Sequence, residues 1–230
     1  MKPRVTAIVL AAGKGSRMGH MTPKQYLPLM GKPMLFYSLN AFAESEADAI
    51  VVVTGKGEEE FCRTQIIERY GIRKIECIIA GGTERYDSVY QGLLAAKGAD
   101  YVLIHDGARP LVSVEIINKA IKKVQELNAC IVGMPVKDTI QLAAEDASIA
   151  ETPPRSMLWM AQTPQCFSYS LVKSSYKKAQ EANDTSLTDD AMVVRKYSNA
   201  SVYLIEGSYH NIKVTTPEDT TIAEALLKGQ

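Results

Sequence analysis

The start of the chain contains a short apolar run that ends in a glycine-rich turn, and this combination restricts the fold more than any other part of the sequence. Val5 to Leu10 is rich in β-branched and apolar residues, which is typical of a strand covered on both faces. Gly13 and Gly15 follow at once, and glycines let backbone N–H groups come close to a ligand. Successive N–H groups in such a turn attract phosphate oxygens. The sequence therefore predicts a buried strand that leads into a candidate phosphate-binding loop.

Two better-known phosphate motifs do not match this loop. The dinucleotide fingerprint G-x-G-x-x-G needs a third glycine at the position of Met18, and the P-loop pattern G-x-x-x-x-G-K-[ST] is absent here. Arg17 and Lys24 bring two positive charges just beyond the turn. A bare G-x-G is equally common in ordinary strand-to-loop turns. Spacing alone therefore leaves a plain turn and a phosphate cradle as open alternatives.

Beyond this loop, short apolar runs alternate with segments of helical apolar spacing. The expected strands are 50–53, 75–79, 101–104, 129–134 and 201–205, and the expected helices are 34–43, 58–70, 88–96, 114–127, 169–182, 188–197 and 217–227. This alternation predicts an α/β fold with a mostly parallel sheet and right-handed crossovers. Ligands of such sheets bind beyond the carboxyl ends of the strands. We expect one domain over residues 1–230.

Residues 137–158 interrupt the alternation. The segment contains short strand-like pieces, a polar turn at Glu145 and Asp146, and the proline pair Pro153 and Pro154. This pattern predicts a β-hairpin arm that leaves the main sheet. It is long for a connection inside a compact domain, and such excursions usually have a function or a partner.

Charge and cysteine content exclude several classes of protein. Lys plus Arg equals Asp plus Glu at 26 each, so no basic field that would capture nucleic acid is expected. The four cysteines (Cys62, Cys77, Cys130 and Cys166) form no C-x-x-C pair, and the three histidines (His20, His105 and His210) lack metal-ligand spacing. No run reaches the roughly 20 apolar residues that span a bilayer. We expect a cytoplasmic protein that binds neither nucleic acid nor membrane.

A second glycine-rich loop follows the strand expected at 75–79. Gly81 and Gly82 lie on the same side of the predicted sheet as the first loop, where they could hold a base or a ribose. Asp87 and Ser88 are also good N-terminal helix residues. Taken alone, the loop is better explained as a turn before a capped helix.

Two further stretches place charged residues near the same side. Asp106 is the carboxylate next to the strand expected at 101–104, where it could hold a hard cation, or it could form a structural ion pair with Arg109. The two interpretations of Asp106 are compatible, because Arg109 could leave the ion pair and bind a substrate phosphate once substrate arrives. Lys213 lies between Ile212 and Val214 in a predicted alternating strand, where a solvent-facing lysine is the simpler interpretation.

Six stretches together carry a family resemblance. In chain order they are AAGKGSRMG with PKQY, AGGTERYDSV, HDGARP, VKDT, RSMLWMAQTPQCF and GSYHNIKVTTPED. They resemble the 2-C-methyl-D-erythritol 4-phosphate cytidylyltransferase family of the non-mevalonate isoprenoid pathway. The resemblance implies a Rossmann-like, sugar-nucleotidyltransferase-like sheet with a projecting arm. It also implies CTP and methylerythritol phosphate as substrates, and a homodimer whose arms exchange.

The resemblance also implies roles for particular residues. The implied catalytic residues are Arg17, Lys24, Arg155 and Lys213; the implied nucleotide-binding residues are Ala11, Ala12, Gly13, Gly15, Gly81, Gly82, Thr83 and Ser88; the implied substrate-binding residues are Asp106, Arg109, Thr139 and Thr163. Arg155 on the arm would reach the neighbouring subunit's site. Thr83 departs from the family pattern, which often has an aspartate there, so a side-chain carboxylate that could accept from the cytosine amino group is absent.

A divalent cation is expected as well. Oxygen ligands and a triphosphate favour Mg²⁺, bound by Asp106 and mostly by triphosphate oxygens.

Two other functions stay open on the sequence. Ribitol 5-phosphate cytidylyltransferase shares G-x-G-x-R-M-G, P-K-Q and T-P-Q, whereas HDGARP, DSV and RSMLW resemble the methylerythritol enzymes better. A nucleotide-binding regulatory module without turnover is the other alternative. Arg17, Lys24, Asp106 and Lys213 together speak against it, because a sensor needs affinity but no arranged attack geometry.

Overall fold

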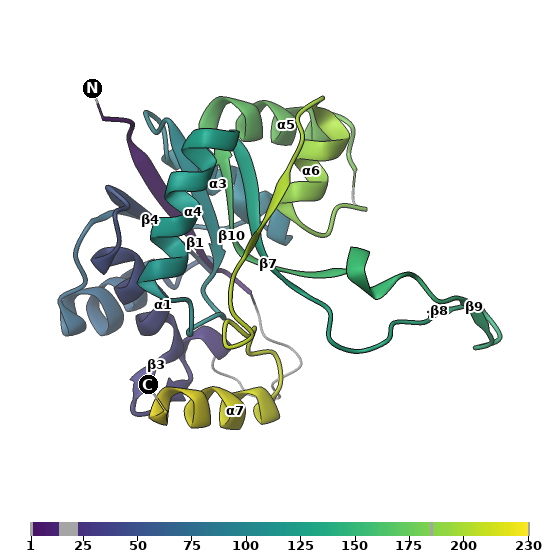
Figure 1. Cartoon of the computed structure of the whole chain (residues 1–230). Coiled ribbons are helices and arrows are strands. Elements are labelled where there is room, and N and C mark those ends of the chain that lie inside the picture. Colours follow the sequence, from purple (N-terminus) through teal and green to yellow (C-terminus); the bar gives the residue numbers. More distant parts are fainter. Residues whose placement is uncertain (1, 14–22, 185, 230) are drawn as a thin grey trace.

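The computed structural model describes residues 2–13, 23–184 and 186–229, and its centre is a seven-stranded sheet (Figure 1). The strands are β1 (Val5–Ala11), β4 (Ala49–Thr54), β5 (Ile75–Ala80), β6 (Tyr101–Asp106), β7 (Ala129–Pro135), β10 (Trp159–Ser168) and β11 (Tyr203–Glu206). Their order is β11-β7-β10-β6-β1-β4-β5. All neighbouring pairs are parallel except the two that involve β10. The predicted α/β class with a mostly parallel sheet is confirmed.

β10 is the main strand that the sequence pattern did not predict. It runs antiparallel between β6 and β7, and its register with β7 shifts between Ala161 and Gln165. Pro164 lies inside this irregular stretch, and a proline within a run argues against a central strand. Gln162, Thr163 and Gln165 are polar although buried, so hydrophobic periodicity is lost where the strand crosses the site. β6 is also two residues longer than expected, so Asp106 ends the strand instead of following it.

Helices cover both faces of the sheet. They are α1 (Met34–Glu44), α2 (Glu59–Cys62), α3 (Arg85–Ala95), α4 (Val114–Leu127), α5 (Tyr169–Glu181), α6 (Asp190–Tyr197) and α7 (Pro217–Lys228). α2 continues into η3 (Arg63–Glu68), which has π-helical geometry where an ordinary helix was expected. Leu39 of α1 and Ile121 of α4 pack on one face of the sheet. Leu93 of α3, Tyr176 of α5 and Val194 of α6 pack on the other.

The helix that follows the second glycine loop begins earlier than predicted. α3 is capped at Glu84 by a capping box with Asp87, so its first turn includes Arg85. The predicted start near residue 88 was therefore too late by one turn. α6 begins two residues after the predicted start at residue 188 and ends as predicted at Tyr197, and the Asp189 side chain caps it by accepting a hydrogen bond from the Met192 N–H.

A third, smaller core joins the two ends of the chain. η2 (Lys24–Tyr26), β2 (Pro28–Leu29) and β3 (Lys32–Pro33) lead into α1, and α7 lies across them at the bottom of Figure 1. Leu29, Met34 and Val214 are completely buried in this core. Residues 211–215 form a loop and not the predicted strand. Lys213 is therefore positioned by the burial of its neighbour Val214, whose N–H donates to the Ala108 carbonyl at 2.8 Å.

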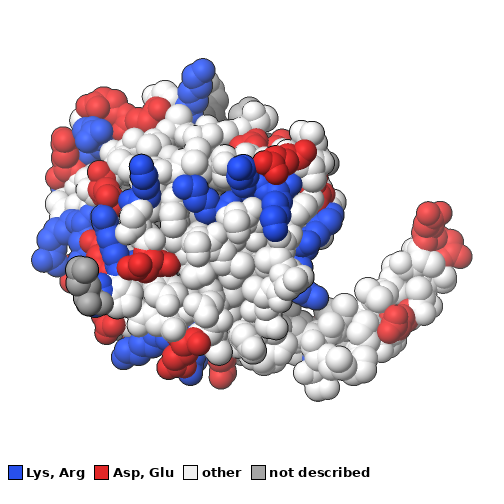
Figure 2. Space-filling view, turned by 90° about the horizontal axis from the view of Figure 1, so that it is seen from above, with Lys and Arg blue, Asp and Glu red and all other residues white. Residues whose placement is uncertain are grey.

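The predicted arm is present and projects away from the sheet (Figure 1). β8 (Leu142–Ala143) and β9 (Ile149–Glu151) form its antiparallel hairpin, and η4 (Arg155–Met157) leads back toward β10. Exposed apolar side chains line the arm, among them Ile149 and Met157 at 67% and 78% exposure. Acidic side chains gather at its far end (Figure 2).

Figure 2 also shows positive and negative side chains interspersed over the face of the body that it presents. Among the described helices, none is both long and apolar enough to cross a membrane.

Candidate active site

The two glycine-rich loops meet at the carboxyl ends of β1 and β5. A side chain on Gly81 would place its Cβ 2.7 Å from the Ala12 Cβ and 2.6 Å from the Ser88 Oγ. A Cβ on Gly82 would overlap the Asp87 side chain. Glycines are therefore required at both positions by close packing against neighbouring side chains.

The expected nucleotide residues are partly explained by this packing. Ala11 is buried, and its carbonyl accepts a hydrogen bond from the Gln25 side chain, while Gly13 is open to solvent. The buried Ser88 hydroxyl accepts from the Gly82 N–H and donates to the Glu84 carbonyl, at 3.2 and 3.1 Å. Thr83 is exposed. Ser88 thus shapes the second loop, and its one donor proton is already used.

Lys24 connects the first loop to the end of the chain. Its Nζ donates to the Val214 carbonyl at 3.1 Å, next to Lys213. Gly15 and Arg17 fall within residues 14–22, outside the described part of the chain. The structure therefore brings Lys24 and Lys213 to the same place, although 189 positions separate them in the sequence.

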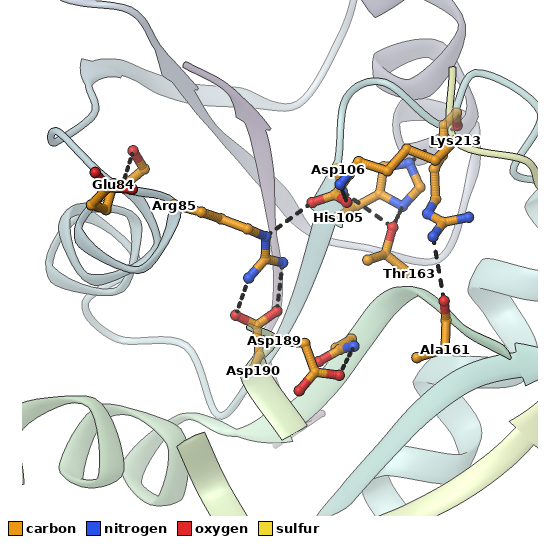
Figure 3. A network of polar contacts seen from close by, with 12 residues as sticks. Glu84, Arg85, His105, Asp106, Ala161, Thr163, Asp189, Asp190 and Lys213 are labelled. Atoms are coloured by element: carbon orange, nitrogen blue, oxygen red, sulfur yellow. Dashed lines mark hydrogen bonds and ion pairs between the residues drawn. The ribbon is translucent and has the colours of Figure 1, made fainter. Parts of the chain in front are cut away.

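Asp106 stands at the centre of the charged residues (Figure 3). Its Oδ1 lies 3.3 Å from the Arg85 Nε, and its Oδ2 lies 2.8 Å from the Lys213 Nζ. Burial alone raises the pKa of Asp106, but the positive charges of Arg85 and Lys213 outweigh it and hold the pKa well below its usual range. Asp106 is therefore a permanent anion that holds two cations.

Arg109 does not form the expected ion pair with Asp106. Its Nη1 donates to the Asn211 carbonyl at 2.8 Å and its Nη2 to the Ala161 carbonyl at 3.4 Å. The Arg109 Nε and the Asn211 Oδ1 are buried without a partner in the described structure. Arg109 therefore ties the loop at Asn211 to β10 and does not pair with Asp106.

Thr163 and His105 form a hydrogen-bonded group next to Asp106. The Thr163 Oγ1 accepts from the Asp106 N–H at 3.2 Å and lies 3.0 Å from the His105 Nδ1. Burial lowers the pKa of His105 to about 4, so the ring is neutral at pH 7. The His105 Nε2 lies 3.3 Å from the Arg109 carbonyl, which can only accept, so Nε2 carries the proton. The Thr163 hydroxyl then donates to Nδ1, and both ring nitrogens are occupied.

Arg155 and Thr139 lie on the arm, apart from this cluster. The Arg155 Nη1 donates to the Lys137 carbonyl at 2.9 Å, and Thr139 is exposed. The Lys137 Nζ lies 3.5 Å from the centre of the Tyr209 ring, which fixes the base of the arm. None of the contacts described for Arg155 or Thr139 reaches Asp106, and Figure 1 shows the arm directed away from the body.

The residue pattern alone predicted no individual role for Arg85 or Asp190. The Arg85 guanidinium binds both oxygens of Asp190 at 2.8 and 2.9 Å and reaches Asp106 with its remaining nitrogen (Figure 3). Asp190 is completely buried and also accepts from the Tyr176 hydroxyl. A buried Asp at the start of α6 could not be recognised without knowing that α3 lies opposite.

The described residues offer few possible ligands for a metal ion. Among the described residues, no group of three or more His, Cys, Asp or Glu side chains could hold a metal ion. Asp106 is one carboxylate at the strand end, and both its oxygens face cations. One carboxylate plus phosphate oxygens is a common Mg²⁺ environment, so the donor set fits a metal that arrives with a triphosphate.

Comparison with known proteins gives a consistent result. The family model "IspD: 2-C-methyl-D-erythritol 4-phosphate cytidylyltransferase" matches residues 5–229. The enzyme of that name from Lachnoclostridium phytofermentans is 47% identical over 225 residues, covering 98% of this chain and 97% of that protein. The Lachnospira eligens enzyme is 48% identical over 226 residues, with coverage of 97% and 99%.

Solved structures agree with these relatives. 4-Diphosphocytidyl-2C-methyl-D-erythritol synthase from Anaerococcus prevotii superposes with a TM-score of 0.86 at 31% identity, covering 98% of this chain and 96% of that one. The Thermus thermophilus 2-C-methyl-D-erythritol 4-phosphate cytidylyltransferase gives 0.81 at 29% identity, with coverage of 98% and 99%.

Proposed function

Because the chain belongs to the 2-C-methyl-D-erythritol 4-phosphate cytidylyltransferase family, we propose that its active site is built around Lys24, Asp106 and Lys213. The enzyme transfers CMP from CTP to 2-C-methyl-D-erythritol 4-phosphate in isoprenoid precursor biosynthesis. The products are 4-diphosphocytidyl-2-C-methyl-D-erythritol and pyrophosphate. The relatives named above act on methylerythritol phosphate by name, so the ribitol and regulatory alternatives are set aside.

The reaction needs no general base. An oxygen of the acceptor phosphate attacks the α-phosphorus of CTP, a new P–O bond forms, and the bond to the β-phosphate bridging oxygen breaks as pyrophosphate leaves. A phosphate monoester has its second pKa at about 6, so the nucleophile is already mostly dianionic at neutral pH. His105 is neutral, with both ring nitrogens bonded, so it supports Asp106 and takes no part in proton transfer.

The main difficulty is to bring two polyanions together, and the cations of the site address it. Lys24 and Arg17 would stabilise negative charge on the triphosphate as it develops. Lys213 and Arg155 would bind the attacking phosphate, while Arg109 and the two threonines (Thr139 and Thr163) would orient the acceptor. The observation that carries this proposal is the ion pair between Asp106 and Lys213. Lys213 lies next to Val214, whose carbonyl accepts a hydrogen bond from Lys24.

The nucleotide would lie over the two glycine-rich loops. The described backbone from Ala11 to Gly13 would approach the phosphates, and Gly81 to Ser88 would hold the base and ribose. Close packing of Gly81 against Ala12 supports this assignment, since it keeps both loops at one point. With Thr83 in place of an acidic residue, backbone carbonyls would accept the amino group of cytosine. A panel of CTP or UTP with methylerythritol phosphate or ribitol phosphate, followed by phosphorus NMR, tests donor and acceptor together.

Mg²⁺ is the proposed cofactor. Asp106 would supply the protein oxygen, and triphosphate oxygens would supply most of the rest. The ion would neutralise phosphate charge. We expect EDTA to abolish pyrophosphate release and added Mg²⁺ to restore it. Full activity in EDTA would mean that the protein cations suffice, and Asp106→Asn would then show whether this carboxylate is needed at all.

The working enzyme is proposed to be a cytoplasmic homodimer with exchanged arms. Exposed apolar side chains on the arm support a protein partner, since Ile149 and Met157 have no cover in the single chain. In a two-fold dimer, each arm would carry Arg155 and Thr139 to the other subunit's site. The free thiols of the four cysteines fit a reducing compartment.

A further inference from the structure

Arg85 lies in the stretch proposed to hold the base and ribose, yet its side chain reaches Asp106 in the other half of the proposed site. It belongs to the first turn of α3, directly behind the second glycine loop, and reaches across to the end of β6 (Figure 3). We propose that Arg85 is a positioning residue for the acceptor: anchored on Asp190, it fixes the Asp106 carboxylate and thereby the Lys213 ammonium. This inference rests on the proposed roles of Asp106 and Lys213.

The anchor is unusually firm for a charged side chain. Both terminal nitrogens of Arg85 bind the Asp190 carboxylate, at 2.8 and 2.9 Å, in the planar two-bond arrangement that only arginine can make. Asp190 has no exposed surface, and the Tyr176 hydroxyl holds it from the α5 side. The guanidinium therefore has one orientation available while this pair is intact.

That orientation directs the third nitrogen at Asp106. The Arg85 Nε lies 3.3 Å from Oδ1, which leaves Oδ2 facing Lys213 at 2.8 Å. Among the described residues, Arg85 and Lys213 are the side chains that form ion pairs with the Asp106 carboxylate. Without Arg85, the carboxylate could rotate about its terminal bond, and the Lys213 side chain, which is 40% exposed, would lose its fixed partner.

A variant that tests the role of Arg85 must not leave a buried charge unpaired. Arg85→Gln alone would strand the Asp190 carboxylate in the core and could unfold the protein. The double change Arg85→Gln with Asp190→Asn removes both charges and keeps a carbonyl oxygen to accept from Tyr176. Thermal unfolding verifies that this variant is folded. Arg73→Gln is the matched control, because Arg73 forms an exposed 2.8 Å pair with Glu44 on the far end of the sheet.

The expected result is a loss confined to the acceptor. The kcat/KM for methylerythritol phosphate should fall roughly 10- to 100-fold in the double variant, as expected when a charge-assisted hydrogen bond is lost. The KM for CTP should stay at the wild-type value, and Arg73→Gln should match wild type in both. An equal rise in the KM for CTP would show that the variant merely loosens the second glycine loop, and would overturn the inference.

A double-mutant cycle with Lys213 identifies the route of the effect. If Arg85 acts through Asp106 and Lys213, the same change should cost almost nothing further in a Lys213→Ala background. A full additional loss in that background would mean that Arg85 touches the substrate itself or acts only through stability, and would reject the positioning role. Unaltered acceptor kinetics in Lys213→Ala alone would instead reject the proposed site, which keeps the two failures distinct.

Discussion

The 2.8 Å contact between Lys213 and Asp106 decides whether this lysine is a surface charge or part of the site. The Lys213 side chain is 40% exposed, so exposure alone would suggest a surface charge. Its partner, however, is a buried carboxylate at the end of a central strand. A lysine held in this way presents a fixed positive charge toward the side where the glycine loops also end.

We expect substitutions of Lys213 and Lys24 to change different kinetic constants. Lys213→Ala should mainly weaken use of methylerythritol phosphate, because this lysine is proposed to bind the attacking phosphate. Lys24→Ala should instead lower kcat by roughly 10²-fold or more, as expected for an electrostatic contact made in the transition state, and Arg17→Ala should behave like it. Steady-state kinetics with each substrate varied in turn measures both. Near-normal turnover in a variant would remove that residue from the catalytic set.

A second residue-level prediction concerns His105. The pKa of this buried ring falls from 6.5 to about 4, so between these values the unfolded chain binds the extra proton and the folded chain does not. Stability therefore decreases as the pH falls, by about 2 kcal/mol from pH 7 to pH 5 for this one group. Urea unfolding at the two pH values should show a smaller decrease in His105→Gln than in wild type.

His210→Gln, which changes an exposed histidine, is the matched control for that comparison. Equal decreases in His105→Gln and wild type would show that the ring is not held neutral. His105 would then have to be reconsidered as a proton carrier.

At the scale of elements, the sequence predicted the parallel strands and the helices well, because both carry strong apolar periodicity. α4 was placed at its observed bounds, since its buried stripe and its cap at Ser113 agree. β10 was missed, because buried polar residues and Pro164 replace the apolar pattern where this strand crosses the site. The segment around Lys213 was wrongly predicted as a strand, since alternation there reflects burial of Val214 in a loop.

The residues of the candidate site could likewise be predicted from the sequence only in part. Asp106 could be recognised as a strand-end carboxylate, and the glycine loops by their composition. Arg85 and Asp190 could not be paired, because they lie 105 positions apart and meet only where the first residues of α3 and α6 approach each other. Family resemblance supplied Thr139, Thr163 and Arg155, for which local spacing gave no signal.

The junction of the two glycine loops gives a prediction for an element. Gly81→Ala would place a methyl group 2.7 Å from the Ala12 Cβ, so the loops must separate. We expect a raised KM for CTP with little change in acceptor use at saturating CTP. Gly229→Ala is the control, since a Cβ there meets only carbonyl oxygens at 3.8 Å or more. Unchanged CTP kinetics in Gly81→Ala would separate this junction from nucleotide binding.

For the molecule as a whole, the arm is the part that a single chain does not explain. It carries exposed apolar residues along its length, and Arg155 donates a hydrogen bond to the Lys137 carbonyl of the arm itself. The proline pair Pro153 and Pro154 restricts the backbone just before Arg155. These features suit an arm that completes its site on a neighbouring subunit. We propose that one active site combines the body of one chain with the arm of another.

Mixed dimers of two inactive variants test this claim most directly. Lys24→Ala damages the body and Arg155→Ala damages the arm, and each alone should be nearly inactive. If Arg155 acts across the dimer, a mixed dimer has one site with both lesions and one with neither. Random pairing after co-refolding should then restore about a quarter of wild-type activity. No recovery, with mixed dimers verified by mass spectrometry, would contradict the account and leave Arg155 in its own subunit.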